Sequence, residues 1–329
     1  MGKFYQILVE CNADIYIEVD LMRLLWSILL LCGIQPASAA EYPEPALAEN
    51  RDTLTHGTLV MDKVVPASEI SLELDGPMVQ GGVVFGVTRP GAKLMQDDQA
   101  VPVSAEGNFI IGFDRLAPEE STLQVEFPDG SFMERKLKIA QRTYAVERID
   151  GLPQEKVTPD PALKQRIESE QALVKEARTL VDDRTDYVKG FEWPVTGRIS
   201  GVYGSQRILN GEPKWPHYGV DIARPEGTPV AAPADATVIL VHPDMFYSGA
   251  TLILDHGQGF SSTFLHLQKI LVKQGQRVKR GEIVGLLGTS GRATGPHLDW
   301  RMNLRGKRVD PAMVVDSMPE LEHAVERGI

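Results

Sequence analysis

Three short segments of the sequence combine histidine with aspartate in a way that could hold a metal ion. His217 and Asp221 are separated by three residues, His266 lies in an apolar run, and His297 and Asp299 are separated by one residue. No cysteine lies near them, so a metal would be held by nitrogen and oxygen atoms. Catalytic zinc takes three such protein ligands and leaves one position for water. These residue types therefore indicate a metal site that could activate water.

Each segment alone has a simpler explanation. An isolated His-x-x-x-Asp pattern occurs often by chance, and His266, between apolar neighbours, could be an ordinary core histidine. His242 and His256 are expected in turns at strand ends. In a strand, however, residues i and i+2 face the same side, so His297 and Asp299 should reach one pocket. Together, in one glycine-rich β region, the segments favour the metal.

Short β-type runs separated by turn residues must position these side chains. From residue 190 onward, 237–241, 250–255 and 259–265 read as strands. Before them, Leu123, Val125 and Phe127 alternate with polar residues, as one buried sheet face requires. Pro128-Asp-Gly130 predicts a hairpin turn into 132–139. Between the two β regions, 160–181 predicts a helix that begins with an aspartate cap and a proline.

The predicted fold class is therefore mainly β. It comprises an N-terminal immunoglobulin-like β-sandwich, a helical linker and a C-terminal glycine-rich antiparallel β-sheet domain. The expected boundaries, in chain order, are 1–40 for a mis-assigned start plus signal peptide, 41–145 for the sandwich, 146–189 for the linker and helix, 190–315 for the candidate zinc domain, and 316–329 for a C-terminal tail.

Composition and the first residues restrict the class of protein. A net charge of −11 argues against a nucleic-acid binder, which needs a basic surface for phosphates, although it leaves room for local basic patches. Residues 22–40 carry one positive charge, a short apolar core and an Ala-x-Ala end, which is typical of a cleaved signal peptide. Both cysteines, Cys11 and Cys32, precede the predicted cleavage. We expect an exported protein of a Gram-negative periplasm that has no disulfides and no stable membrane insertion after cleavage.

Four runs together resemble a known family. They are Trp193-Pro-Val-Thr-Gly-Arg-Ile-Ser-Gly-Val-Tyr-Gly-Ser-Gln-Arg207, His217-x-x-x-Asp221, Phe264-Leu-His266-Leu and Gly295-Pro-His297-Leu. In this order they are similar to the lysostaphin/LytM-type zinc endopeptidases of bacterial cell walls, over about residues 190–315. The resemblance implies hydrolysis of peptide cross-links in peptidoglycan by a metal-activated water, with Zn²⁺ as cofactor and stem peptides as partners.

Residue by residue, the resemblance implies two groups in the site. His217 and Asp221 match the first two zinc ligands, and His266 and His297 match two histidines that handle protons without binding the metal. The third ligand of the family is a second histidine in a His-x-His pair, and Asp299 stands at that place. Two carboxylates make the centre less positive than one does. We therefore expect a less acidic bound water and a shifted metal preference or pH optimum.

Two rival functions stay open from the sequence. A catalytically inactive relative would bind the wall or activate another hydrolase, although such proteins usually lose several site residues. A biotinyl- or lipoyl-type carrier is suggested by the turns around Lys273 and Lys279, which lack the expected Met or Ala neighbour. Arg207 could contact an acidic stem peptide, but a surface arginine is the simpler expectation. The helix at 160–181 could cover the cleft as a plug.

Overall fold

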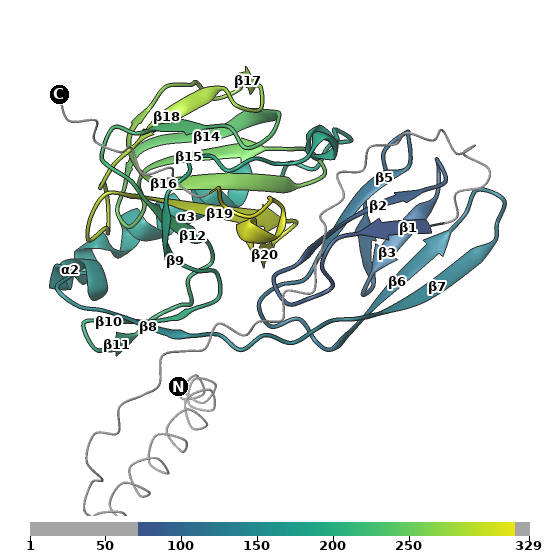
Figure 1. The fold of residues 1–329 in the computed structure, drawn as a ribbon, viewed down its shortest axis with the longest axis horizontal. Coiled ribbons are helices and arrows are strands. Elements are labelled where there is room, and N and C mark those ends of the chain that lie inside the picture. Colours follow the sequence, from purple (N-terminus) through teal and green to yellow (C-terminus); the bar gives the residue numbers. More distant parts are fainter. Residues whose placement is uncertain (1–71, 320–329) are drawn as a thin grey trace, which may run out of the picture. The chain divides into compact units, whose positions relative to one another are not determined.

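The computed structural model describes residues 72–319, and these form a mainly β structure, as the sequence predicts (Figure 1). The predicted signal peptide, residues 41–71 of the predicted sandwich and the end of the tail lie outside the described residues. Within residues 72–319, no helix has the length and apolar character needed to cross a membrane. All described residues belong to one unit of the chain.

Seven strands form two antiparallel sheets around an apolar core in the N-terminal part. One sheet has the order β1-β2-β5 and the other β4-β3-β6-β7. Alternate residues of β6 are buried, and Gly130 has φ +82° in the predicted hairpin turn. The immunoglobulin-like topology stays a prediction. The strands are β1 (Leu72–Asp75), β2 (Val83–Thr88), β3 (Lys93–Gln96), β4 (Gln99–Val101), β5 (Asn108–Gly112), β6 (Glu120–Glu126) and β7 (Phe132–Lys138).

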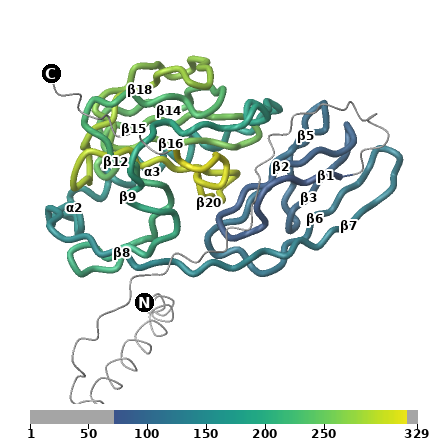
Figure 2. Tube along the Cα trace, viewed as in Figure 1, coloured from purple at the N-terminus to yellow at the C-terminus, as the bar shows by residue number. Residues whose placement is uncertain are grey.

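The segment between the two β regions contains a strand as well as helices (Figure 2). Strand β8 pairs in parallel with β10, so this part of the predicted linker is tied to a sheet. The Asp160 side chain accepts a hydrogen bond from the backbone of Ala162, as expected for a helix cap. The elements are β8 (Val146–Ile149), α2 (Gln154–Val157), the 3-10 helix η1 (Pro161–Leu163), α3 (Lys164–Ala177) and the 3-10 helix η2 (Asp186–Lys189).

Ten strands of the C-terminal part form one large antiparallel sheet. Its main path is β17-β14-β15-β16-β19-β12-β9, and Figure 1 shows β14, β15, β16 and β19 side by side. The strands of the whole C-terminal part are β9 (Arg198–Gly201), β10 (Gln206–Leu209), β11 (Glu212–Pro213), β12 (Val220–Ala223), β13 (Pro229–Ala231), β14 (Ala236–Met245), β15 (Gly249–Asp255), β16 (Phe260–Ile270), β17 (Arg277–Val278), β18 (Ile283–Leu287), β19 (His297–Leu304) and β20 (Lys307–Val309), followed by the 3-10 helix η3 (Pro311–Met313). Strands β10 and β11 lie outside this sheet, in a small sheet with β8.

Both faces of the central strands are covered. Every residue of β15 is buried, and so are the first eight residues of β16. On one face Trp300 is fully buried against the edge of Trp193, with ring centroids 5.7 Å apart. On the other, Val174 and Ala177 of α3 pack against a small cluster that includes Leu240. Strands buried on both faces form a rigid base, which can hold side chains in fixed positions.

Candidate metal centre and groove

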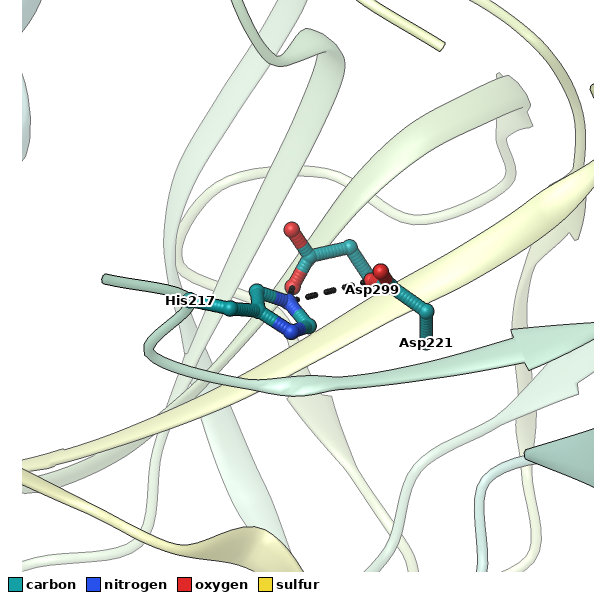
Figure 3. Close-up of side chains that lie close together, drawn as sticks. All are labelled: His217, Asp221 and Asp299. Atoms are coloured by element: carbon teal, nitrogen blue, oxygen red, sulfur yellow. Dashed lines mark ion pairs between the residues drawn. The ribbon is translucent and has the colours of Figure 1, made fainter. Parts of the chain in front are cut away.

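Two aspartates face each other across neighbouring strands of the large sheet. Asp221 on β12 and Asp299 on β19 are direct partners in the antiparallel register. His217 lies just before β12, where its backbone N–H donates to the carbonyl of Ser205 and its carbonyl accepts from Gly204. Figure 3 shows the imidazole of His217 directed toward both carboxylates. The sheet register and one short loop thus bring together three of the predicted residues.

The spacing of these side chains fits a single ion. Their ligand atoms all lie within 4.8 Å of one another. Nε2 of His217 lies 3.1 Å from Oδ1 of Asp221 and 3.4 Å from Oδ1 of Asp299. Tetrahedral zinc with bonds of about 2.0–2.1 Å places its ligand atoms about 3.3 Å apart. Both ring nitrogens of His217 and Oδ1 of Asp221 are buried without a hydrogen-bond partner. Buried orphaned polar atoms are costly, and a shared cation would satisfy them.

The surrounding charges make this a site for a cation. Burial and the facing Asp299 act to raise the pKa of Asp221, but His217 and Arg207 outweigh them and hold it below its usual value. Burial also opposes ionisation of Asp299, yet Arg301 and His217 hold its pKa well below the usual range. Conversely, burial acts to lower the pKa of His217, and the two carboxylates raise it overall. Facing carboxylates repel each other unless positive charge lies between or beside them.

Two glycines leave space for the carboxylates. A Cβ atom at Gly219 would lie 2.6 Å from Oδ1 of Asp299, and one at Gly201 would lie 2.4 Å from Oδ2 of Asp221. Real side chains do not approach so closely, so any larger residue would displace the candidate ligands. Gly219, which lies between His217 and Asp221 in the sequence, thus makes room for Asp299 on the neighbouring strand.

Two arginines complete the charge balance. Arg301 donates from Nε to Oδ1 of Asp299 at 2.9 Å and from its terminal nitrogen to Oδ2 at 2.6 Å. Arg207 pairs with Asp221 and also with Glu147, at 3.0 Å for the latter. The expectation of a surface position for Arg207 was wrong, since its side chain is only 16% exposed. Arg301 was missed, although its i+2 spacing from Asp299 on one strand was a usable signal.

The two remaining predicted histidines lie beside this cluster. The ring centroids of His266 and His297 are 4.9 Å apart, and Nε2 of His297 lies 3.8 Å from Oδ1 of Asp221. Nδ1 of His266 lies 2.7 Å from the carbonyl of Ser290, and Nδ1 of His297 lies 2.9 Å from that of Gly295. A carbonyl only accepts, so each Nδ1 carries a proton, and Nε2 is the ring nitrogen of each histidine that is left to face the cluster.

The backbone at His266 is unusual for a strand. Its φ is +63°, in the left-handed region that non-glycine residues seldom adopt. The pairing of β15 with β16 shifts register between Ala250 and Leu252, so Leu265 and His266 together oppose one residue. Burial lowers the pKa of His266 to about 4, so the ring is neutral at pH 7. The bulge thus directs the side chain of His266 toward the site. Strained backbone conformations of this kind are often found at functional sites.

The other two histidines of this region are not part of the cluster. The expected place at a strand end is confirmed for His256, which directly follows β15, and is wrong for His242. His242 is inside β14, opposite Thr251. His256 is fully buried, with its ring nitrogens 2.9 Å from the carbonyl of Asp235 and from Oγ of Ser262. Its ring packs edge-on against Phe191. His256 is therefore a satisfied core histidine, the explanation that the sequence offered for His266.

A groove opens onto the candidate metal centre. Its cavity volume is about 1040 Å³, and His217, His266 and Asp299 are among the residues that line it. Helix α3 contributes Val174 to the lining, and β16 contributes Thr263. A groove of this size can take several residues of an extended peptide.

Comparison with known proteins identifies the family. The model of peptidase family M23 matches residues 215–311. A crystal structure from Pseudomonas aeruginosa, assigned to peptidase M23, shares 32% sequence identity with a TM-score of 0.54 and covers 72% of this chain and 94% of its own. This chain belongs to peptidase family M23. The similarity to that M23 structure therefore extends well beyond the region that the family model matches.

The curated relatives match about a third of this chain. Peptidoglycan DD-endopeptidase ShyA of Vibrio cholerae is 42% identical over 115 residues, which are 33% of this chain and 26% of that protein. A Haemophilus influenzae protein named as an uncharacterized metalloprotease is 41% identical over 121 residues, 37% of this chain and 22% of its own. The chain thus spans about a quarter of the length of these curated relatives.

Proposed function

We propose that this M23 protein is a zinc-dependent endopeptidase that hydrolyses peptide cross-links of peptidoglycan outside the cytoplasm, in a Gram-negative periplasm. The observation that carries the proposal is the convergence of His217, Asp221 and Asp299 on one buried point. The names of the curated relatives support peptidoglycan as substrate and a metal as cofactor. An inactive scaffold would have no need to keep a buried cluster whose charges must be balanced.

In this proposal His217, Asp221 and Asp299 hold the zinc ion. Bound there, zinc would supply Lewis acidity that polarises a peptide carbonyl and acidifies water. Arg301 adds one positive charge directly behind Asp299. The pair of Asp299 and Arg301 is together neutral, like the histidine found at this place in the family. The charge deficit expected from a second carboxylate is therefore largely offset by the chain itself.

His266 and His297 are proposed to handle protons. Each ring is fixed by its Nδ1 hydrogen bond to a backbone carbonyl, and each presents Nε2 as the free nitrogen. His266, neutral because of its burial, is suited to accept a proton from water. His297 is then placed to hold a proton for the developing charge or the leaving amine. The backbone anchors keep both rings from turning away during the reaction.

Metal content and wall cleavage test the proposal together. The full chain, His217→Ala, Asp299→Ala and a control His242→Ala are compared for bound zinc and for release of soluble fragments from purified cross-linked peptidoglycan. We expect one zinc per chain in the wild type and in His242→Ala, and neither zinc nor cleavage in His217→Ala. Cleavage by zinc-free wild type would overturn the metal mechanism, and stoichiometric zinc without cleavage would favour a scaffold.

A further inference from the structure

The groove carries the opposite charge from the chain as a whole. The net charge of the sequence is −11, yet Glu170 and Asp299 are the only acidic residues among those that line the cavity. The basic residues that line it are Lys175, Arg178, Arg207, Lys214, Arg292, Arg301 and Arg308. A basic groove in an acidic protein attracts and orients anionic groups, because the field is concentrated where water is partly excluded.

Several of these cations already have partners. Arg207 and Arg301 pair with the candidate ligands, and Lys214 pairs with Glu212. By contrast, no ion pair with any residue in the described range 72–319 is formed by Arg178, Arg308, Lys175 or Arg292. Arg178 and Arg308 are therefore among the groove cations that could engage an incoming carboxylate without first losing a carboxylate partner within the protein.

Both free arginines are held in place by neutral groups. Arg178, just after α3, donates to Oγ1 of Thr263 at 2.8 Å, and its Nε is buried without a hydrogen-bond partner. The guanidinium of Arg308 on β20 lies 6.0 Å from the centre of the Tyr218 ring. Arg178 thus has an anchored guanidinium with an unused donor, and the guanidinium of Arg308 has no side-chain hydrogen bond within residues 72–319. A planar guanidinium with free donors matches the two oxygens of a carboxylate.

The two arginines lie beside the metal centre. Thr263, which accepts from Arg178, is the direct register partner of Arg301 on β19. Arg308 is the register partner of Asn303, two residues further along the same strand. Strand β19 therefore carries the candidate ligand Asp299. It also pairs with Thr263, which binds Arg178, and with Arg308 itself.

The mutual repulsion of these cations is consistent with an anion site. Burial, then Arg308 and Arg301, lower the pKa of Arg178 to about 9. Burial and Arg301 likewise lower the pKa of Arg308 to about 10. Both guanidinium groups are still charged at neutral pH. An anion placed between them would relieve this repulsion and replace the water that burial has removed.

We propose that Arg178 and Arg308 form a carboxylate-binding subsite in the groove, which selects peptides that carry a free carboxylate close to the bond presented to the metal centre. This inference rests on the proposed function for the identity of the reacting bond, but the binding itself does not depend on catalysis. Its ligand is an acidic peptide, and peptidoglycan stem peptides have this chemistry. Amidation of the recognised carboxyl removes the charge and therefore the selection.

Binding of matched peptides tests this subsite. A purified peptidoglycan stem peptide with free carboxylates and the same peptide with its carboxylates converted to amides are titrated calorimetrically into the full chain. Measurements use Asp221→Asn as background, so that hydrolysis does not interfere. We expect the free-carboxylate peptide to bind at least about tenfold more tightly, as one charge-assisted contact provides. This preference should weaken as salt is raised.

Arginine variants identify the groups responsible. In the same background, Arg178→Gln and Arg308→Gln should each reduce the preference, and the double variant should abolish it. Arg115→Gln is the matched control, because Arg115 is also half-buried, donates to a carbonyl and lies against a tyrosine, but does not line the groove. Thermal unfolding of each variant checks the fold. If the double variant does not fold, the two single variants show whether the arginines cause the preference for the free-carboxylate peptide.

The outcomes separate this inference from the proposed function. Equal binding of both peptides, or a preference that survives in Arg178→Gln and Arg308→Gln, would overturn the subsite even if the wild type cleaves peptidoglycan. If the preference for the free-carboxylate peptide depends on both arginines but the wild type never cleaves peptidoglycan, the subsite would be supported and the proposed enzymatic function would be refuted.

Discussion

The N-terminal sandwich and the large C-terminal sheet use charged residues in opposite ways. In the sandwich, Lys93 and Glu126 form an ion pair on the surface, with side chains 76% and 54% exposed. In the large sheet, Asp221 and Asp299 face each other with side chains 9% and 1% exposed. Exposed pairs contribute little stability, whereas a buried charge is costly unless it is compensated.

This difference shows which region the chain maintains for chemistry. The sandwich has an apolar core, and its ion pairs with Glu126 and Glu120 lie on the surface. The sheet keeps buried carboxylates at a cost, and it needs Arg207, Arg301 and a cation to offset that cost. A free-energy cost of this kind is characteristic of functional sites, where residues are kept for activity although they lower local stability.

The largest expected difference between the regions comes from replacing one aspartate in each. Asp221→Asn should remove bound metal and lower the rate of peptidoglycan hydrolysis on the order of a thousandfold or more, because metal catalysis supplies several kcal/mol of the barrier reduction. Asp129→Asn, which breaks the surface pair with Arg89, should leave both unchanged. Initial rates and metal analysis measure the two effects. Comparable losses in the two variants would refute the division between the regions.

A core substitution should show the opposite pattern. Phe109 is fully buried in the sandwich, where a Cβ at Gly86 would lie 2.1 Å from its ring. Phe109→Ala should lower the free energy of unfolding by about 3–5 kcal/mol, because it leaves a cavity. Hydrolysis per folded molecule should be unchanged at a temperature where the variant is folded. Denaturant titration and rate assays on the same sample check this, and a rate that falls in the folded state would couple the sandwich to catalysis.

Arg301 should matter most when the metal is absent. Arg301→Met leaves the buried Asp299 carboxylate without its bidentate partner, which should destabilise the metal-free protein by about 3 kcal/mol. Zinc should recover much of this loss, since a cation replaces the missing charge. Thermal unfolding with chelator and with zinc gives the comparison, and Arg89→Met in the sandwich is the control. An equal loss in both conditions would show that Arg301 acts only through packing.

Acid should weaken the large sheet through His256. Burial lowers the pKa of His256 to about 4, from about 6.5 in an unfolded chain. Its contribution to stability is complete above pH 6.5 and is lost as the pH falls toward 4, because only the unfolded state binds the proton. Between pH 6.5 and 5 the loss should be about 2 kcal/mol. His256→Phe should reduce this dependence in denaturant titrations of metal-free protein; an unchanged dependence would assign it to other groups.

The smallest effect is expected at the sandwich surface. Lys93→Met removes one member of the exposed pair with Glu126, and water and salt replace the interaction. The unfolding midpoint should not change measurably at physiological salt, nor should wall cleavage. Differential scanning calorimetry checks the midpoint. A clear shift would mean that the sandwich surface, like the sheet, depends on specific charge pairs.

Much of the fold followed from local patterns. Alternation at Leu123 and Val125 identified a strand with one buried face, and the Pro-Asp-Gly130 turn ended it. The runs 237–241, 250–255 and 259–265 lie within or largely overlap β14, β15 and β16. The helix predicted at 160–181 is shorter in the structure, where α3 covers Lys164–Ala177. Sequence periodicity indicates the type of element well and its ends poorly.

Local sequence patterns predicted the site only in part. The i+2 spacing predicted that His297 and Asp299 reach one pocket, and both do lie by His217 or Asp221. The roles of Arg207 and Arg301 depend on which strands pair, and the bulge that directs His266 arises from a register shift. His256 lies at a strand end as expected, but its complete burial was not predicted, because it depends on Phe191, which is far away in the chain.

The sequence by itself determined the candidate ligands, the family resemblance and the predominance of β-structure, because residue type and short spacing are local properties. The tertiary structure decided that Asp221 opposes Asp299, that Arg301 balances the second carboxylate, and that Arg178 and Arg308 enter one groove. Those facts depend on strand register and on packing between segments many residues apart, and alternation along a single strand carries no information about its partner.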